Sequence, residues 1–406
     1  MKKILCAALL ILAIAACAPA PAEVPSESPS AAPIAEPSES PSVTPPEIPP
    51  LSRFSLDERF ERWYAEPVRA FRPSADYGAI YPFIGAVSTF DLWGEPWERS
   101  CYGFATADGK IVCDAVYPTI DTATDGNKLI YVAERVVERV GEYDAISETV
   151  VISADGSFAQ TYEDAYLYGG DGYVSVKSGG KWGVIDFDGR EIFKPQFAAP
   201  PIYGDGLFAV ISDDYATYRY IDASGAAVLG PYALYLEDWY LHDNDEAFSN
   251  LCSFLRGFAF AGGSAPYIGT AERGEYGNWT FTFGYMDKNG DPITEPEFSG
   301  YDYRLPSYYE LINGYPESEA ERVPFADRED VRAFSIGNGL YMVYKYAPYK
   351  YGICDADENF LVPLEFDILH TYGGDYSAVR QGYYGGLIDK NGEWIVKVSL
   401  LDYLDD

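Results

Sequence analysis

Trp182-Gly183-Val184-Ile185-Asp186-Phe187-Asp188-Gly189-Arg190-Glu191-Ile192 is a phrase that this chain repeats, with variations, seven times. The phrase is an aromatic residue, a glycine, two apolar residues, an aspartate, a glycine-containing turn and a second apolar run. Close copies lie at Phe283–Ile293, Tyr351–Val362 and Gly385–Val396, and looser copies lie at Cys101–Val112, Val151–Phe158 and Tyr220–Val228. Repeats of this length indicate small sheets that stack or are arranged around an axis.

Each copy predicts a β-hairpin. In the clearest copy, Val184 and Ile185 belong to one strand and Ile192 to the next, with a turn of Asp and Gly residues between them. An apolar run that reads as a third strand follows this copy at 206–211, and another follows the Tyr351 copy at 376–379. The predicted unit is therefore a three-stranded meander, with a fourth strand as an option.

The spacing of the turns shows where the chain departs from the repeat. The turn glycines or their equivalents are Gly109, Gly156, Gly189, Gly225, Gly290, Asn359 and Gly392. A base period of about 33–36 residues is visible, and two longer gaps follow Gly225 and Gly290. Both gaps carry helix signals: apolar spacing over Phe248–Leu255, and the capping pattern Ser307-x-x-Glu310. We therefore expect helical insertions in these gaps rather than lost repeats.

The phrase resembles the bacterial WG repeat. The best match is Trp182–Asp186 followed by Lys194-Pro195-Gln196-Phe197, and the copies at 283–298 and 351–366 share its proline and aromatic residue. The resemblance covers most of residues 100–396. The copies at 149–158 and 219–228 lack the opening glycine, and the copy at 101–112 lacks the aspartate. Because most members of this family have no known function, the resemblance implies a shape and little chemistry.

The expected fold is all-β, with repeated antiparallel meanders over residues 77–406. Seven units favour a seven-bladed β-propeller, in which ring closure protects the strand edges, over an open β-solenoid. The stretch Ala79–Phe90 could supply a strand that closes the ring. Residues 51–76 are expected to form a short helical segment, which Ser55 begins and Pro67 ends.

The N-terminal residues predict export. Residues 1–16 read as a signal peptide, with Lys2 and Lys3 before an apolar core too short to span a bilayer as a mature helix. Ile14-Ala15-Ala16-Cys17 resembles the lipobox of bacterial lipoproteins, which implies an acylated Cys17 holding the protein on the membrane, outside the cytoplasm. An ordinary cleaved signal with a chance cysteine is the alternative. Residues 17–50, rich in Pro and Ser and without aromatic residues, predict a disordered linker.

The chain is strongly acidic, with 29 basic and 63 acidic residues and a net charge of −34. Phosphate backbones repel such a chain, so we do not expect it to bind nucleic acid. We also do not expect it to attach to anionic lipid through basic patches. The charge favours cationic partners, although acidity that keeps an exported protein soluble is a simpler explanation. The oligomeric state does not follow from the sequence.

Four cysteines follow the signal: Cys101, Cys113, Cys252 and Cys354. No CxxC pattern suggests zinc. A two-residue turn at Asp108-Gly109 would place Phe104, rather than Cys101, opposite Cys113. We therefore predict no bridge between the first two cysteines and favour four buried free thiols.

The sequence offers little catalytic chemistry. Its two histidines, His242 and His370, are not accompanied by a nucleophile elbow, a phosphate loop or a zinc constellation, so we expect no enzyme, no catalytic residue and no cofactor. Six residues of the acidic turns are weak calcium candidates: Asp186, Asp188, Asp287, Asn289, Asp389 and Asn391. The same residue types are common in hairpin turns, and we favour a role in the turns over metal binding.

The expected function is a protein-interaction or scaffold module anchored in the cell envelope. A glycan-binding surface protein is the alternative, with candidate aromatics Trp239, Tyr240, Tyr308 and Tyr309 in the two insertions, where they could equally fill a core. Exposed aromatics clustered on one face would favour a glycan. A carboxylate-based glycoside hydrolase ranks last, because it requires two acids about 5–10 Å apart at the floor of a cleft.

Overall fold

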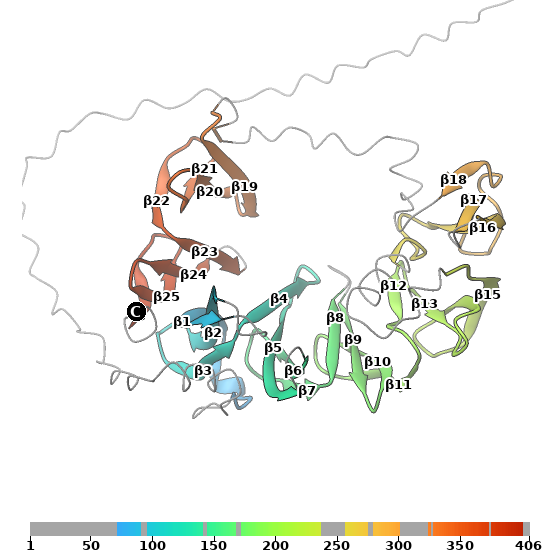
Figure 1. Cartoon of the computed structure of the whole chain (residues 1–406), viewed down its shortest axis with the longest axis horizontal. Coiled ribbons are helices and arrows are strands. Elements are labelled where there is room, and N and C mark those ends of the chain that lie inside the picture. Colours follow the sequence, from blue (N-terminus) through green and yellow to red (C-terminus); the bar gives the residue numbers. More distant parts are fainter. Residues whose placement is uncertain are drawn as a thin grey trace, which may run out of the picture. The chain divides into compact units, whose positions relative to one another are not determined.

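The computed structural model describes residues 71–90, 96–140, 144–167, 172–236, 256–274, 279–300, 324–325, 328–372 and 375–400. Within them the chain forms 26 β-strands in seven antiparallel sheets, shown in Figure 1, and one short 3-10 helix, η2 (Ala75–Tyr77). Ser74 begins this helix, since its hydroxyl accepts a hydrogen bond from the N–H of Asp76. No helix in these residues is long and apolar enough to cross a membrane.

The seven sheets follow one another along the chain, and in each the strands pair in sequence order. We number the sheets 1 to 7. Sheet 1 contains β1 (Ile80–Phe90), β2 (Pro96–Thr106) and β3 (Ile111–Tyr117); sheet 2 contains β4 (Thr119–Thr124), β5 (Leu129–Val140), β6 (Asp144–Ser153) and β7 (Ala159–Tyr162). Sheet 3 contains β8 (Asp164–Leu167), β9 (Tyr173–Ser178), β10 (Lys181–Asp186) and β11 (Glu191–Phe197).

Sheet 4 contains β12 (Ile202–Gly204), β13 (Leu207–Ile211), β14 (Thr217–Ile221) and β15 (Ala227–Ala233); sheet 5 contains β16 (Ser264–Arg273), β17 (Trp279–Asp287) and β18 (Phe298–Gly300). Sheet 6 contains β19 (Val331–Gly337), β20 (Leu340–Lys345), β21 (Lys350–Asp355) and β22 (Phe360–Phe366); sheet 7 contains β23 (Ile368–Tyr372), β24 (Tyr376–Gln381), β25 (Tyr384–Asp389) and β26 (Trp394–Ser399). The all-β class and the seven meanders predicted from the repeats are therefore confirmed.

Each copy of the phrase begins in the second-to-last strand of one sheet and leads into the last strand. The copy at 182–192 spans β10 and β11, and its turn closes with the N–H of Gly189 donating to the carbonyl of Asp186 at 2.9 Å. The prediction that a third strand follows each copy within the same unit is wrong. The run at 207–211 is β13, in the next sheet, and the strands that complete sheet 3 precede the phrase. A repeat fixes the period of a pattern but not the residue at which the unit begins.

The glycine of the phrase accommodates an irregularity in the neighbouring strand. The register between β10 and β11 shifts across Gly183, and a Cβ on this residue would lie 2.5 Å from the carbonyl oxygen of Phe193. The same shift and a similarly close carbonyl occur at Gly103 and Gly352. Sheet 2 has Val150 at this position, and its β6–β7 register is unbroken. In sheets 1, 3 and 6 the glycine leaves room for the carbonyl of the bulged strand, whereas sheet 4 has the same register shift across Arg219.

Apolar clusters join the sheets in sequence order. One joins sheets 2 and 3 through Ile130 and Val174, one joins sheets 3 and 4 through Val184 and Phe208, and a large one joins sheets 4 and 5. Sheets 6 and 7 share a further cluster. Among the described residues no apolar cluster joins sheets 5 and 6, which are consecutive in the chain but separated by residues 301–323.

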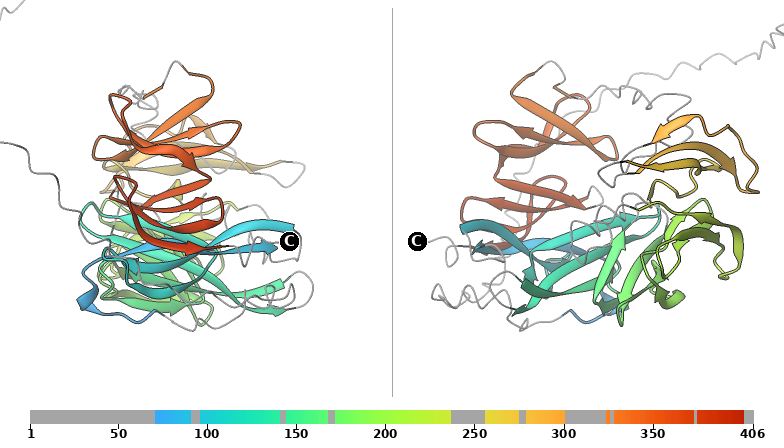
Figure 2. Two further views of the ribbon diagram at one scale, coloured as in Figure 1. Left: turned by 90° about the vertical axis from the view of Figure 1, so that its left-hand side faces the viewer. Right: turned by 45° about the vertical axis from the view of Figure 1, so that its right-hand side comes forward.

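The first and last sheets pack together, which distinguishes a propeller-like arrangement from an open solenoid. Phe83 of β1 packs with Leu387 and Val396 of sheet 7, and β1 lies beside this sheet in both views of Figure 2. The stretch Ala79–Phe90, expected to supply a closing strand, does form a strand, and β1 packs on the last sheet. It hydrogen-bonds to β2 of its own sheet, so the contact between sheets 1 and 7 is made by side chains such as Phe83 and Leu387.

Several predictions lie outside the described residues. These are the signal peptide, Cys17 and the linker, the helix expected near Ser55, and the two insertions with Cys252 and His242. The three described cysteines, Cys101, Cys113 and Cys354, are buried, and no disulfide joins any two of them, as expected. Phe104 is the register partner of Cys113, as predicted, although the register shifts between Phe104 and Ala105, so the turn is longer than the two residues assumed.

Candidate functional site

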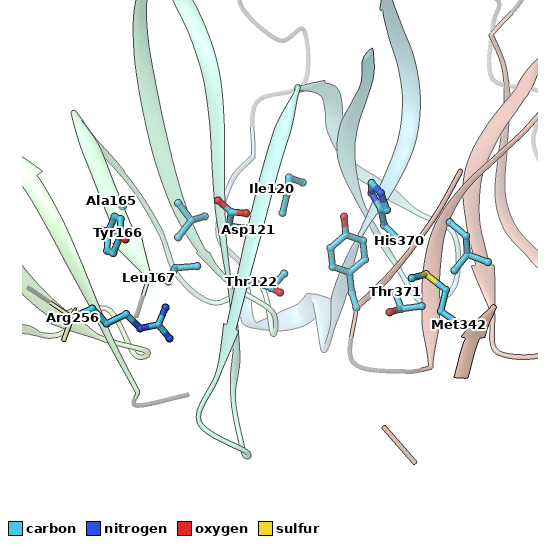
Figure 3. A pocket seen from close by; sticks show the side chains of 13 residues that line it. Ile120, Asp121, Thr122, Ala165, Tyr166, Leu167, Arg256, Met342, His370 and Thr371 are labelled. Atoms are coloured by element: carbon cyan, nitrogen blue, oxygen red, sulfur yellow. The ribbon is translucent and has the colours of Figure 1, made fainter. Parts of the chain in front are cut away.

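A cavity of about 670 Å³ lies where the first strands of several sheets meet, and Figure 3 shows its lining. Strands β4, β8 and β23 line it from sheets 2, 3 and 7, with further side chains from β5, β20 and Arg256. These elements are far apart in sequence, and only the packing of the sheets brings them together. Ligand sites in proteins are commonly concave, with an apolar lining and a few polar groups.

Two side chains of opposite charge face this cavity. Asp121 lies on β4 beside Thr122, and Arg256 lies on the side of the cavity away from His370 in Figure 3. Both side chains are exposed. In the part of the chain that the structure describes, no ion pair involves either of them.

His370, on β23, is held by a tyrosine of another sheet. The hydroxyl of Tyr102 on β2 lies 2.7 Å from Nδ1 of His370, and the two rings stack with centroids 5.9 Å apart. Although the imidazole faces the open cavity, protein surrounds the rest of the ring, and this desolvation lowers the pKa of His370. Burial raises the pKa of Tyr102, so its phenol stays protonated and the hydrogen bond joins two neutral groups.

A cluster of aromatic rings lies on sheet 6, and we call it the aromatic platform. It consists of the exposed Phe334, Tyr346 and Tyr349 and the half-buried Tyr344 and Tyr351. The rings of Phe334 and Tyr344 are parallel within 4°, with centroids 5.8 Å apart, and the phenol oxygens of Tyr344 and Tyr346 are 2.6 Å apart. The exposed fractions of Phe334 and Tyr349 are 50% and 64%. Large rings at such exposure are unusual, and their clustering indicates a binding surface.

The platform adjoins the cavity. Phe334 on β19 is the register partner of Met342 on β20, and Met342 belongs to the cavity lining. Arg332, two residues before Phe334, places its guanidinium 6.0 Å from the ring centroid of Tyr346. An aromatic surface with a cationic side chain at its edge thus lies next to a cavity with mixed polar and apolar lining.

The aromatics predicted from the sequence are not described. Trp239, Tyr240, Tyr308 and Tyr309 all lie outside the described residues, so that prediction is untested. The platform was not predicted from the sequence, although residues 344–351 contain four tyrosines. Tyrosines on both sides of a hairpin turn could have predicted an aromatic surface there.

The acidic turns have a structural role in every described case. In the turn of sheet 5, Oδ1 of Asp287 accepts hydrogen bonds from the N–H groups of Asn289 at 2.8 Å and Asp291 at 2.9 Å. Asp186 and Asp389 make the same pair of bonds in sheets 3 and 7. Among the described residues no three acidic, histidine or cysteine side chains are grouped so that they could hold a metal ion. Asp188 and Asn391 lie on the same turns.

One prediction about these turns is wrong. The residue of the sheet 6 turn that takes the glycine position is Glu358, and not Asn359. Its φ is 66°, and its N–H donates to the carbonyl of Asp355 at 3.2 Å. The carboxylate pair that a glycoside hydrolase would need is not supplied by the described lining of the cavity, in which Asp121 is the one carboxylate.

No protein-family model and no curated protein matches this chain. Solved structures similar to it include HIRA residues 644–1017, at 12% identity and a TM-score of 0.23, over 43% of this chain and 51% of that one. An acylaminoacyl peptidase in complex with Z-Gly-Gly-Phe-chloromethyl ketone is 9% identical, with a TM-score of 0.31, over 68% and 51% of the two chains. This chain thus spans about half the length of these two.

The β-propeller domain of the Trilobed protease from Pyrococcus furiosus, described as having an open velcro topology, is also similar. It is 9% identical, with a TM-score of 0.23, over 66% of this chain and 80% of that one. These likenesses concern the fold alone, and nothing about a ligand of this chain follows from them.

Proposed function

We propose that this chain is a non-catalytic binding module of the cell envelope and that its ligand is a glycan held on the aromatic platform. The observation that supports this is the cluster of rings on sheet 6, in which Phe334, Tyr346 and Tyr349 are exposed and the ring of Tyr344 stacks on that of Phe334. One face of a pyranose ring carries mainly C–H groups, and such a face packs on an aromatic ring while the hydroxyl groups remain free to form hydrogen bonds.

The polar groups of the platform match this chemistry. The hydroxyls of Tyr344 and Tyr346 lie side by side, and the guanidinium of Arg332 is close to the ring of Tyr346. These groups can donate to and accept from the equatorial hydroxyls of a sugar. A neutral glycan also avoids the repulsion that a chain with a net charge of −34 exerts on anionic polymers.

Export and lipid anchoring are part of this proposal, and they rest on the sequence. The signal at residues 1–16, the lipobox-like Ile14–Cys17 and the Pro/Ser linker would place the β domain outside the cytoplasm on a tether. Metabolic labelling with an alkyne-tagged fatty acid tests the anchor. The wild-type chain should incorporate the label and the Cys17→Ala chain should not, whereas equal labelling would refute acylation at Cys17.

A protein partner is the second candidate, and a specific observation favours it. Exposed tyrosines beside an arginine, as in Tyr346 and Arg332, are the residue types that dominate the binding energy of protein interfaces. The platform would then be the contact surface of a scaffold. The two candidates share the same residues and differ in the ligand.

A glycan array, run beside a pull-down from envelope extract, separates the candidates. The full chain with Cys17→Ser is used as the probe, together with Phe334→Ala, Tyr349→Ala and the control Tyr383→Ala. Tyr383 is a suitable control because it is 53% exposed but lies on sheet 7, outside the platform.

A glycan ligand predicts array binding that weakens roughly threefold to tenfold for each platform variant and stays unchanged in the control. A partner protein captured by the wild-type chain and lost with both platform variants, without array binding, would support the scaffold instead. Binding that none of the variants alters would refute the platform as the site.

A further inference from the structure

We infer that the cavity where β4, β8 and β23 meet is a second binding site, separate from the platform, and that it takes a short zwitterionic peptide. In this assignment Arg256 pairs with a carboxylate of the ligand and Asp121 pairs with its ammonium group. The inference goes beyond the proposed function, since it rests on different residues and on a different ligand class. Figure 3 shows the arrangement on which it depends.

The size of the cavity fits a ligand of a few residues. Its volume of about 670 Å³ falls within the range of roughly 300–1,000 Å³ that is typical of small-molecule sites. Its apolar lining includes Ile120, Leu167 and Met342, and hydroxyl groups are supplied by Thr122 and Thr371. A peptide presents the matching chemistry, because apolar side chains alternate with amide groups that need hydrogen-bond partners.

Arg256 is the cationic group of the lining. In the described part of the chain no carboxylate pairs with it, although acidic residues outnumber basic ones about two to one. A guanidinium that faces a cavity binds a planar carboxylate through paired hydrogen bonds, which are stronger than bonds between neutral groups. In so acidic a chain, this arginine is a local site for an anion.

Asp121 supplies the opposite charge, and in the view of Figure 3 it lies between Arg256 and His370. No lysine or arginine of the described residues pairs with it, and its side chain is exposed on β4. Because His370 is uncharged at neutral pH, the lining contains one cation and one anion. A ligand with one ammonium group and one carboxylate gives both Asp121 and Arg256 a partner.

The lining also argues against other ligand classes. A single carboxylate is a poor site for a divalent cation, which takes several oxygen ligands. A polyphosphate would meet one cation in a chain of strongly negative net charge. A peptide with free termini satisfies both charges and the apolar walls at once.

Isothermal titration calorimetry with three tripeptides tests the site. The full chain with Cys17→Ser is titrated with Ala-Leu-Ala, with its N-acetylated form and with its C-amidated form. Acetylation removes the ammonium group and amidation removes the carboxylate, so each form deletes one of the two contacts. The free tripeptide should bind at least about tenfold more tightly than either blocked form, as expected for the loss of a charge-assisted hydrogen bond.

Two variants assign each contact. Arg256→Gln should bind the free and amidated peptides equally, and Asp121→Asn should bind the free and acetylated peptides equally. The matched controls are Arg219→Gln and Asp291→Asn, two exposed residues outside the cavity lining, which should behave as the wild type. If Arg256→Lys again prefers the peptide with a free carboxylate, the defect of Arg256→Gln is due to the lost charge and not to misfolding.

Equal binding of all three peptides by the wild-type chain would overturn the inference, as would the absence of any binding. Neither result depends on whether a variant folds. The inference is also distinguishable from the glycan proposal, because Phe334→Ala should leave tripeptide binding unchanged while it weakens binding to the array.

Discussion

The phenol oxygen of Tyr102, in the second strand of sheet 1, lies 2.7 Å from Nδ1 of His370, in the first strand of sheet 7. This hydrogen bond joins the first and last units of the repeat at the edge of the cavity. It fixes which nitrogen of the imidazole faces the ligand space, and it makes the contact between the terminal sheets specific rather than merely apolar.

This pair makes stability depend on pH in a defined direction. The pKa of His370 is lowered from 6.5, so the unfolded chain takes up a proton before the folded chain does. The contribution of the neutral imidazole to the free energy of unfolding is complete above pH 6.5. It is lost as the pH falls through the pKa that His370 has in the folded chain. We expect the difference in unfolding free energy between wild type and His370→Gln to shrink between pH 7 and pH 5.

Urea denaturation at several pH values measures this difference. Tyr102→Phe should lower the unfolding free energy by about 1 kcal/mol at pH 7, through loss of one hydrogen bond. A difference between wild type and His370→Gln that grows on acidification would contradict the assigned direction of the pKa shift.

Gly183→Ala should destabilise the protein by about 1–3 kcal/mol, the usual cost of overpacking. The new Cβ would lie 2.5 Å from a backbone carbonyl, which cannot move without disturbing the β10–β11 pairing. Gly126→Ala is the comparison, because Gly126 has a φ of 88° but nothing within 4 Å of an added Cβ, so its loss of about 1 kcal/mol measures backbone strain alone. Thermal unfolding should show the larger loss for Gly183→Ala, and no loss in Gly183→Ala would mean that the bulge is not the reason for the glycine.

Glu358→Gly should stabilise the chain modestly, by about 1 kcal/mol or less, because Glu358 has a φ of 66° where most of the other turns have glycine. The gain is limited because the Glu358 carboxylate accepts a hydrogen bond from the N–H of Phe325 at 3.0 Å. The reverse change, Gly225→Ala, should lower stability by about 1 kcal/mol because Gly225 has a φ of 83°. The loss should be no larger, because an added Cβ there meets only ordinary contacts. Chemical denaturation of both variants checks the opposite signs.

EDTA and added Ca²⁺ should each leave the melting temperature unchanged. Oδ1 of Asp287 already accepts two backbone N–H groups, and these bonds, first that of Asp291 and then that of Asn289, lower the pKa of Asp287. The stabilising effect of this carboxylate should therefore be present above its usual pKa of 3.8 and be lost as the pH falls below it. A marked change in melting temperature with EDTA would show that the turns hold a metal.

The order of the strands, the hairpins and their turns could be predicted from the sequence because they depend on neighbours along the chain. In sheets 3 to 7 the aspartate of the turn bonds to N–H groups two and four residues later, so its role is local. The pairing of Phe104 with Cys113 was predicted, but the register shift beside it was not. The beginning of each repeat unit did not, because a periodic pattern has the same appearance wherever the unit starts.

What the sequence alone determined is that this chain is a series of seven β-hairpin units, most of them with a glycine and an acidic turn. Only the tertiary structure placed Tyr102 against His370, Asp121 and Arg256 in the lining of one cavity, and the rings of sheet 6 at the surface. Hairpin formation is a matter of local backbone conformation and short-range hydrogen bonds. The cavity and the exposure of a ring depend on how whole sheets pack, and that packing joins residues more than 200 positions apart.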